Sequence, residues 1–378
     1  MITRKESLRV RVASGMLAGA LLLFAAFEAR ASPRFPRPPK AQFGVKFTGE
    51  AFSGLLGGLR RGSEGNYLLD ARFALNSEQL GLWRDGELYM DITHIRGAQP
   101  SSRLSGDIQV ASNIAAPAAT RVYEFWYAQD FADRRVRLRL GIVDLNKHFD
   151  AVPGSGQLNN SSFGVEPALS LNAPASIYPE PGWGMTAGAL LGKDWHARLG
   201  LFQGQPARRS APLSRGAMLI GELTRSSSPA EPVYMLGMWH YAQPQGGGFG
   251  NPASDWGAYA AWVTPLPDAQ RRLFLQAGYS PAAASRAPYY LEAGYAWDGP
   301  FSGRPDDRLS LGLARAWVRT TTATGLQAET ALEANYGFAF GDHLMLAPDL
   351  QYILQPLGTG APVPNAWVAL LRLYANTD

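Results

Sequence analysis

The stretch "RVRLRLG" in the first half of the chain alternates strictly between basic and apolar side chains. Arg137 and Arg139 fall on one face of an extended strand, and Leu138 and Leu140 fall on the other. A period of two is typical of a β-strand, because successive side chains leave opposite faces of the sheet. One such strand fits a soluble antiparallel sheet as well as a membrane barrel, so the assignment depends on the rest of the chain.

The same pattern recurs along most of the sequence. From about residue 66 onward, short alternating or aromatic-rich stretches are separated by turn-forming residues, and long amphipathic helices with capping signals are missing. The sequence therefore predicts an all-β fold. Sixteen strands are expected, over residues 66–75, 86–97, 107–114, 121–131, 136–145, 182–192, 195–204, 216–226, 233–242, 254–265, 272–281, 288–299, 309–319, 326–338, 344–356 and 365–376.

The connectors between these strands fall into two classes when alternate ones are placed on opposite sides. One side has tight turns such as "ADRR" and "GDH", whereas the other has "QPQGGGFGNPA", "LGTGAPVP" and one very long segment over 146–181. This asymmetry is typical of outer-membrane barrels, as are charged residues on the inward face. The predicted fold is a transmembrane antiparallel β-barrel of about 16 strands, covering residues 65–378.

The long segment 146–181 follows the fifth predicted strand and is expected to be the third extracellular loop. A loop of this length is seldom a mere connection, and folding inward would narrow the pore. An outward lid, or a site for surface partners, is the alternative.

The N-terminus predicts export. Basic residues precede the apolar run "MLAGALLLFAAF" and the small-residue site "ARAS", so residues 1–31 are expected to be a cleaved signal peptide. The run is shorter than the roughly 20 residues that a spanning helix needs. Residues 32–64 begin with the proline-rich segment "SPRFPRPPK" and are predicted to be a periplasmic segment that is extended and unpacked.

Charge and cysteine content narrow the function classes. The net charge is +4, and loss of five basic and two acidic residues with the signal peptide would lower it to +1. The basic character is thus largely a property of the signal, which argues against nucleic acid as a partner. The chain has no cysteine, so it depends on no disulfide and cannot be a lipoprotein.

Several blocks resemble the carbohydrate-selective porin family, the OprB type. In the family's order they are "VASNIAAP", "YEFWYAQDFADRRVRLRLGIVDLNKHF", "LNNSSFG", "SIYPEPGWG", "LGLFQGQP", "GRPDDRLSLGLA", "APDLQYILQP" and "LLRLY". The resemblance implies a sixteen-stranded barrel in the bacterial outer membrane, with lipid around it, that lets monosaccharides such as glucose diffuse inward. A general diffusion porin without sugar preference, and a structural or polysaccharide-export barrel, remain alternatives. Sequence leaves monomer and trimer open.

Sugars are polyols with apolar ring faces, so a weak site needs charged and amide groups for the hydroxyls and an aromatic side chain for the ring. Glu124 and Trp126 on one strand, with Arg137 and Arg139 on its hairpin neighbour, are expected to form a ladder beside the long loop. The complete set of lumen candidates is Arg72, Asp91, Glu124, Trp126, Arg137, Arg139, Glu292, Glu329, Glu333, Asp349 and Gln351.

Enzyme chemistry has little support in the sequence. The five histidines are scattered without metal-ligand spacing, and no GxSxG or GxxxxGK motif occurs in the mature chain. A glycosidase needs only two facing carboxylates, which Glu329 and Asp349 on adjacent strands could provide. We therefore expect a channel with no cofactor and no metal.

Overall fold

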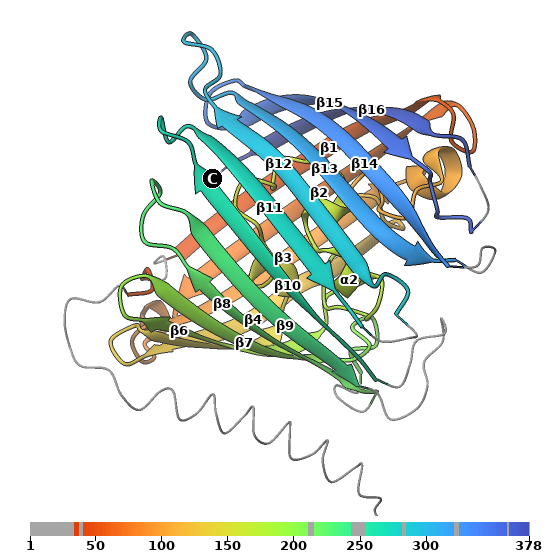
Figure 1. The fold of residues 1–378 in the computed structure, drawn as a ribbon. Helices are drawn as coiled ribbons and strands as arrows, with labels where there is room; N and C mark the ends of the chain where they lie inside the picture. The colour runs from red at the N-terminus through yellow and green to blue at the C-terminus, as the bar shows by residue number, and fades with distance from the viewer. Residues whose placement is uncertain are drawn as a thin grey trace, which may run out of the picture.

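The computed structural model describes residues 34–37, 41–210, 215–242, 254–281, 285–320, 325–360 and 363–377. Sixteen antiparallel strands form one closed barrel in which sequence neighbours pair and β1 meets β16 (Figure 1). This confirms the predicted fold class and strand number. The strands are β1 (Ala41–Leu56), β2 (Gly62–Asn76), β3 (Gly86–Gly97), β4 (Ala119–Phe131), β5 (Val136–Ile142), β6 (Trp183–Leu191), β7 (Trp195–Gln203), β8 (Ala217–Arg225), β9 (Val233–Ala242), β10 (Ser254–Pro265), β11 (Arg271–Tyr279), β12 (Tyr289–Asp298), β13 (Arg308–Arg319), β14 (Leu326–Ala339), β15 (Leu344–Leu354) and β16 (Ala366–Asn376).

The first strand begins much earlier than predicted. β1 starts at Ala41, so the boundary between a periplasmic segment over 32–64 and a barrel over 65–378 is wrong. Its inner face carries Lys46 and Glu50, and its outer face carries Phe43 and Phe47, which is the alternation of a barrel wall. The proline-rich stretch directly before it is typical of a linker, so the sequence does not mark where the first strand begins.

The predicted strand over 107–114 does not exist. These residues alternate like a strand, but the backbone N–H groups of Ile108 and Gln109 donate to the Glu329 carboxylate instead of to a neighbouring strand. The segment belongs to the β3–β4 connection. The predicted number of sixteen strands is correct only because the missed strand, β1, offsets the wrongly predicted strand over 107–114.

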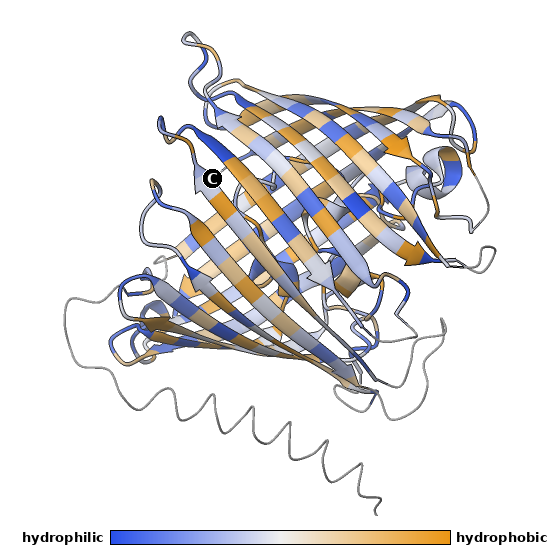
Figure 2. Ribbon diagram, viewed as in Figure 1, coloured by the Kyte–Doolittle hydropathy of each residue, from blue (hydrophilic) through white to orange (hydrophobic). Residues whose placement is uncertain are grey.

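Outward-facing side chains along the strands are large and apolar. Leu138 and Leu140 of β5 are 43% and 61% exposed, and the outer positions of most other strands carry exposed Leu, Phe, Trp, Met or Tyr. Figure 2 shows the resulting alternation of hydrophobic and hydrophilic positions along each strand. An apolar outer band around a closed sheet suits contact with lipid.

The two ends of the barrel differ. β1 begins and β16 ends at the same end, which also carries short turns such as 132–135 and 192–194. The opposite end carries the β3–β4 connection 98–118, here called loop L2, and the β5–β6 connection 143–182, here called loop L3. By the usual orientation of such barrels, the short-turn end is periplasmic and the loop end is extracellular.

The described helices are all short and, apart from one in a turn, lie in L2 and L3. They are the 3-10 helices η1 (Ser77–Leu80), η3 (Leu145–Lys147) and η4 (Ser161–Phe163), the π-helix η2 (Ser101–Ser105) and the α-helix α2 (Pro167–Ser170). Within the described ranges, no helix is long and apolar enough to cross a bilayer.

The part of the proline-rich segment that the structure describes, residues 34–37, is extended but packed. The Phe35 N–H donates to the Arg134 carbonyl at 2.7 Å, and the Phe35 ring lies beside Arg137 and His196, with centroid distances of 5.0 and 5.3 Å. Both neighbours face the barrel interior near its short-turn end, so the expectation of an unpacked segment fails here. The predicted signal peptide, residues 1–31, lies outside the described residues.

A buried ion pair joins the two strands that close the barrel. Arg372 of β16 and Glu50 of β1 pair in register, with Nη2 and Oε2 2.5 Å apart and side chains only 2% and 0% exposed. Because neither charge is solvated by bulk water, each depends on the other.

We predict that Arg372→Met lowers the free energy of unfolding by about 3–5 kcal/mol, because it leaves the Glu50 carboxylate buried and unpaired. The double variant Glu50→Gln/Arg372→Met should recover most of this loss. Equilibrium guanidinium unfolding of the refolded barrel measures both. Equal losses in the single and double variants would contradict the pairing argument.

Candidate functional site

Loop L3 lies inside the barrel, where acidic side chains of the wall hold its backbone. The Glu124 carboxylate on β4 accepts from the Asp144 N–H at 3.0 Å. On β14, the Glu333 carboxylate accepts from the Asn160 N–H at 3.0 Å and from the adjacent residue's N–H. A loop without sheet partners leaves backbone donors unsatisfied, and carboxylates are strong acceptors for them.

A second contact fixes the middle of L3 from two sides. The Glu222 carboxylate on β8 accepts from the Asp150 N–H at 2.9 Å and from the Tyr259 hydroxyl at 2.7 Å. Asp150 in turn accepts from the Glu166 N–H at 2.8 Å and from the Gln276 amide. These residues are buried, so L3 is attached to the wall at intervals from β4 round to β14.

Apolar packing holds L3 against the wall formed by β7 to β13. Phe149 and Leu169 of L3 cluster with inward side chains such as Phe202 and Trp239. Opposite Phe163 the wall has only a glycine, since a Cβ on Gly312 would lie 2.5 Å from the ring. This half of the lumen is filled by protein.

Loop L2 closes the region beside the β1–β16 junction. Its Leu104 and Ala111 pack on Phe52 and Val368, all essentially inaccessible. The Glu329 carboxylate on β14 accepts from the N–H groups of two L2 residues and from that of Leu357 in the β15–β16 loop at 2.7 Å. One carboxylate thus joins two loops to the wall.

Five of the predicted lumen residues lie beneath these loops. Glu329 and Glu333 bind loop backbone, and the Gln351 amide donates to the Ala111 carbonyl of L2 at 2.8 Å. Asp349 accepts from Gln351 at 3.1 Å and from Asn335. Glu292 accepts from the Tyr290 hydroxyl, which also donates to the Ser162 carbonyl. None of the five is more than 4% exposed. Their positions on the inward face agree with the prediction, but in this conformation they are buried and bind a loop directly or through one neighbouring side chain.

Five other predicted residues do come together, on the wall formed by β2 to β5. With two residues that the sequence reading missed, they form what we call the lumen cluster: Arg72, Tyr89, Asp91, Glu124, Trp126, Arg139 and Lys147. Lys147 lies near the start of L3, and the others are inward positions of four adjacent strands.

Asp91 links the wall to the loop. Its Oδ2 lies 3.7 Å from Arg72 Nε and 3.5 Å from Lys147 Nζ, and Lys147 also pairs with Glu124. Burial lowers the pKa of Lys147 and the adjacent Glu124 raises it, with a net upward shift, so the ammonium stays charged at neutral pH. Lys147 is therefore both a solute-accessible cation and an anchor of L3.

Aromatic rings stack within the same cluster. Tyr89 and Trp126 are parallel at 4.8 Å, the Arg139 guanidinium lies 4.3 Å from the centre of the Trp126 ring, and Lys147 Nζ lies 5.7 Å from that of Tyr89. Cations over ring faces are attracted by the ring quadrupole, so the stack orders both basic side chains. Arg137 is not part of it; it pairs with Asp130 at 2.5 Å near the short-turn end.

Comparisons with known proteins agree with this architecture. Residues 60–376 match the family model described as carbohydrate-selective porin, OprB family. The chain belongs to the carbohydrate-selective porin family. It is also similar to Porin B of Pseudomonas aeruginosa, with 24% identity over 88% of this chain and 86% of that protein.

Solved structures of similar fold include OprB of Pseudomonas putida at high pH, with a TM-score of 0.78, 19% identity, and coverage of 89% of this chain and 94% of that chain. The outer-membrane channel DcaP of Acinetobacter baumannii has a TM-score of 0.55, 10% identity, and coverage of 94% and 100%. The protein is an outer-membrane porin of the carbohydrate-selective type, and members of this family are channels.

Solvent access separates the cluster of this porin into two layers. The side chains of Lys147 and Arg72 are 38% and 32% exposed, whereas those of Asp91 and Glu124 are 2% and 1% exposed. The carboxylates lie behind the cations, so the solvent-accessible part of the cluster presents mainly hydrogen-bond donors. Among the described residues, no group of three or more His, Asp or Glu side chains could hold a metal ion.

We predict that Lys147→Met lowers the free energy of unfolding by about 1–3 kcal/mol, because Asp91 and Glu124 lose a charged partner while remaining buried. The fluctuation of the open-channel current should rise as L3 loosens. Lys193→Met, which removes an exposed lysine in the β6–β7 turn, is the matched control. Identical stability and current noise in both variants would show that Lys147 does not anchor the loop.

Proposed function

We propose that this porin lets neutral monosaccharides such as glucose diffuse passively into the periplasm, and that the lumen cluster is where they make their selective contacts. The observation that carries the proposal is the pair of accessible cations, Arg72 and Lys147, held on the shared Asp91 oxygen beside Tyr89. The route past them is the polar half of the lumen, opposite the half that L3 fills.

The chemistry of the cluster suits a polyol. Guanidinium and ammonium groups donate hydrogen bonds to hydroxyl oxygens, and the partly exposed Tyr89 offers an apolar surface to the sugar ring. Because Arg72 already pairs with Asp70 and Asp91, and Lys147 with Asp91 and Glu124, these donors gain little by binding a solute. Affinity should then stay low, as conduction requires.

A general diffusion porin is the alternative class. It would use the same fold and the same constriction but would have no aromatic side chain arranged beside the donors. The Tyr89–Trp126 stack is the feature that favours sugar selectivity here. The same proposal includes contact with outer-membrane lipid, a monomeric or trimeric state, and removal of residues 1–31 as a signal peptide.

Single-channel current in a planar bilayer, titrated with glucose and with an uncharged non-sugar of similar size, tests the proposal. We expect saturable block by glucose alone. Arg72→Gln and Tyr89→Leu should each weaken the block about threefold to tenfold, because each removes one hydrogen-bonding or ring contact.

Arg84→Gln, which changes an exposed arginine in the β2–β3 turn, is the control for Arg72→Gln and should leave the block unchanged. Wild-type current indifferent to glucose would favour a general porin. Block that persists unchanged in both cluster variants would place the selective contacts elsewhere.

A further inference from the structure

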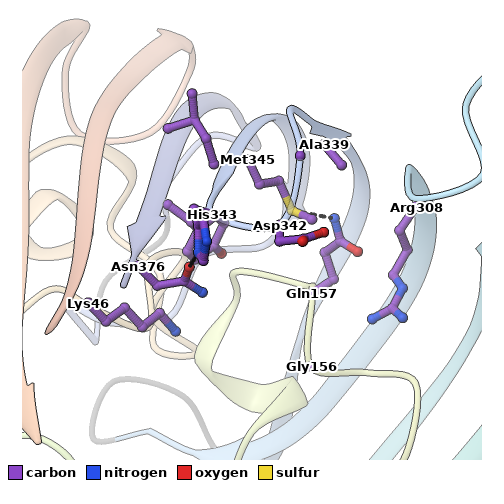
Figure 3. A pocket seen from close by; sticks show the side chains of 12 residues that line it. Lys46, Gly156, Gln157, Arg308, Ala339, Asp342, His343, Met345 and Asn376 are labelled. Carbon is purple, nitrogen blue, oxygen red and sulfur yellow. Dashed lines mark hydrogen bonds between the residues drawn. The ribbon is translucent and has the colours of Figure 1, made fainter. Parts of the chain in front are cut away.

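A cavity of about 290 Å³ opens at the short-turn end of the lumen (Figure 3). It lies between the tip of L3 at Gly156 and Gln157, the β14–β15 turn with Asp342 and His343, and the junction of β1 with β16. The first strand, the tip of L3 and the last four strands therefore build it together. The volume is at the lower limit of small-molecule sites, which suits a ligand of monosaccharide size.

The cavity is separate from the lumen cluster but adjacent to it. No cluster residue lines it, yet Lys46 of β1, which does, pairs in register with Asp70, two positions before Arg72 on the same inward face. Lys46 and Arg72 are thus diagonal neighbours on adjacent strands, so a solute beside Arg72 is already next to the wall of the cavity.

The side chain at the tip of L3 has unused hydrogen-bonding capacity. Gln157 is only 7% exposed, its amide nitrogen has one long contact at 3.8 Å to the Met345 sulfur, and its carbonyl oxygen has no partner within the described structure. Buried amides are normally satisfied. A side chain held in this state at the wall of a polar cavity is suited to a ligand hydroxyl.

The remaining lining supplies both donors and acceptors. Lys46 lies over the Tyr374 ring at 5.5 Å, with no carboxylate within ion-pair distance among the described residues. Arg308 pairs with Asp298 yet stays 43% exposed, and Asp342 is exposed. His343 is held against Asn376 at 3.2 Å. A ligand with several hydroxyls can both donate and accept hydrogen bonds here, whereas the accessible groups of the lumen cluster are mainly donors.

We propose that this cavity, the exit site, is a second weak monosaccharide-binding site through which solutes leave for the periplasm. The proposal rests on the proposed sugar transport. A sugar hydroxyl donates to the Gln157 carbonyl oxygen or the Asp342 carboxylate, while Lys46 and Arg308 donate to ring and hydroxyl oxygens. Two weak sites in series let a solute leave the first for the second, which favours throughput over retention.

The test is single-channel block with glucose added to one compartment at a time, so that each channel is titrated from both ends. Gln157→Leu and Asp342→Asn should each weaken binding at the exit site by one hydrogen bond. The association rate of glucose added at the periplasmic end should therefore fall about threefold to tenfold. The rate from the other end should not change. Asp268→Asn, the same charge change in the β10–β11 turn outside the cavity, should alter neither rate.

The outcomes distinguish this inference from the function on which it rests. Wild-type channels that glucose does not block from either end would overturn both. Wild-type block with unchanged rates from both ends in Gln157→Leu and Asp342→Asn would overturn the exit site alone. Equal loss from both ends would show that the variants disturb L3, and would also overturn it.

Discussion

The structure depends on how a long loop can exist inside a barrel. A loop in the lumen has no neighbouring strand to satisfy its backbone N–H groups, and an unsatisfied buried donor costs about 1–3 kcal/mol. Carboxylates on the inner wall meet this demand: Glu124, Glu222, Glu329 and Glu333 each accept at least one loop N–H. The wall thereby determines where L2 and L3 lie, and the loops determine where the open passage lies.

The loops divide the lumen into two unlike halves. Along β7 to β13, many inward side chains are apolar and buried against L3, with buried polar residues such as Glu222 among them and a glycine opposite Phe163. Along β2 to β5, many inward side chains are charged, and cations such as Arg72 stay partly exposed in front of buried carboxylates. The open passage is thus the part of the lumen that the loop leaves uncovered, and Lys147 of L3 lies at its edge.

Much of this architecture could be predicted from sequence. Alternation gave fifteen of the sixteen strands and the inward position of every predicted lumen residue, because side-chain direction in a strand follows from a period of two. Alternation could not tell whether an inward carboxylate meets water or a loop. Glu329 and Arg72 have the same period, yet one is buried under L2 and the other is accessible.

Two functional residues illustrate what the pattern does not contain. Tyr89 alternates like its neighbours, but its stacking on Trp126 depends on cross-strand register. Lys147 lies in a loop, where no period applies, and its role follows from the folding of L3 against β3 and β4. Residues 107–114 show the opposite error, since an alternating segment can be a loop whose partners are carboxylates.

An experimental structure of the protein soaked in concentrated glucose would test the central claim most directly. The account predicts L3 inside the barrel, with sugar oxygens within hydrogen-bonding distance of the Arg72 guanidinium and the Lys147 ammonium. Sugar bound in the lumen away from these two side chains, or L3 lying outside the barrel, would contradict it.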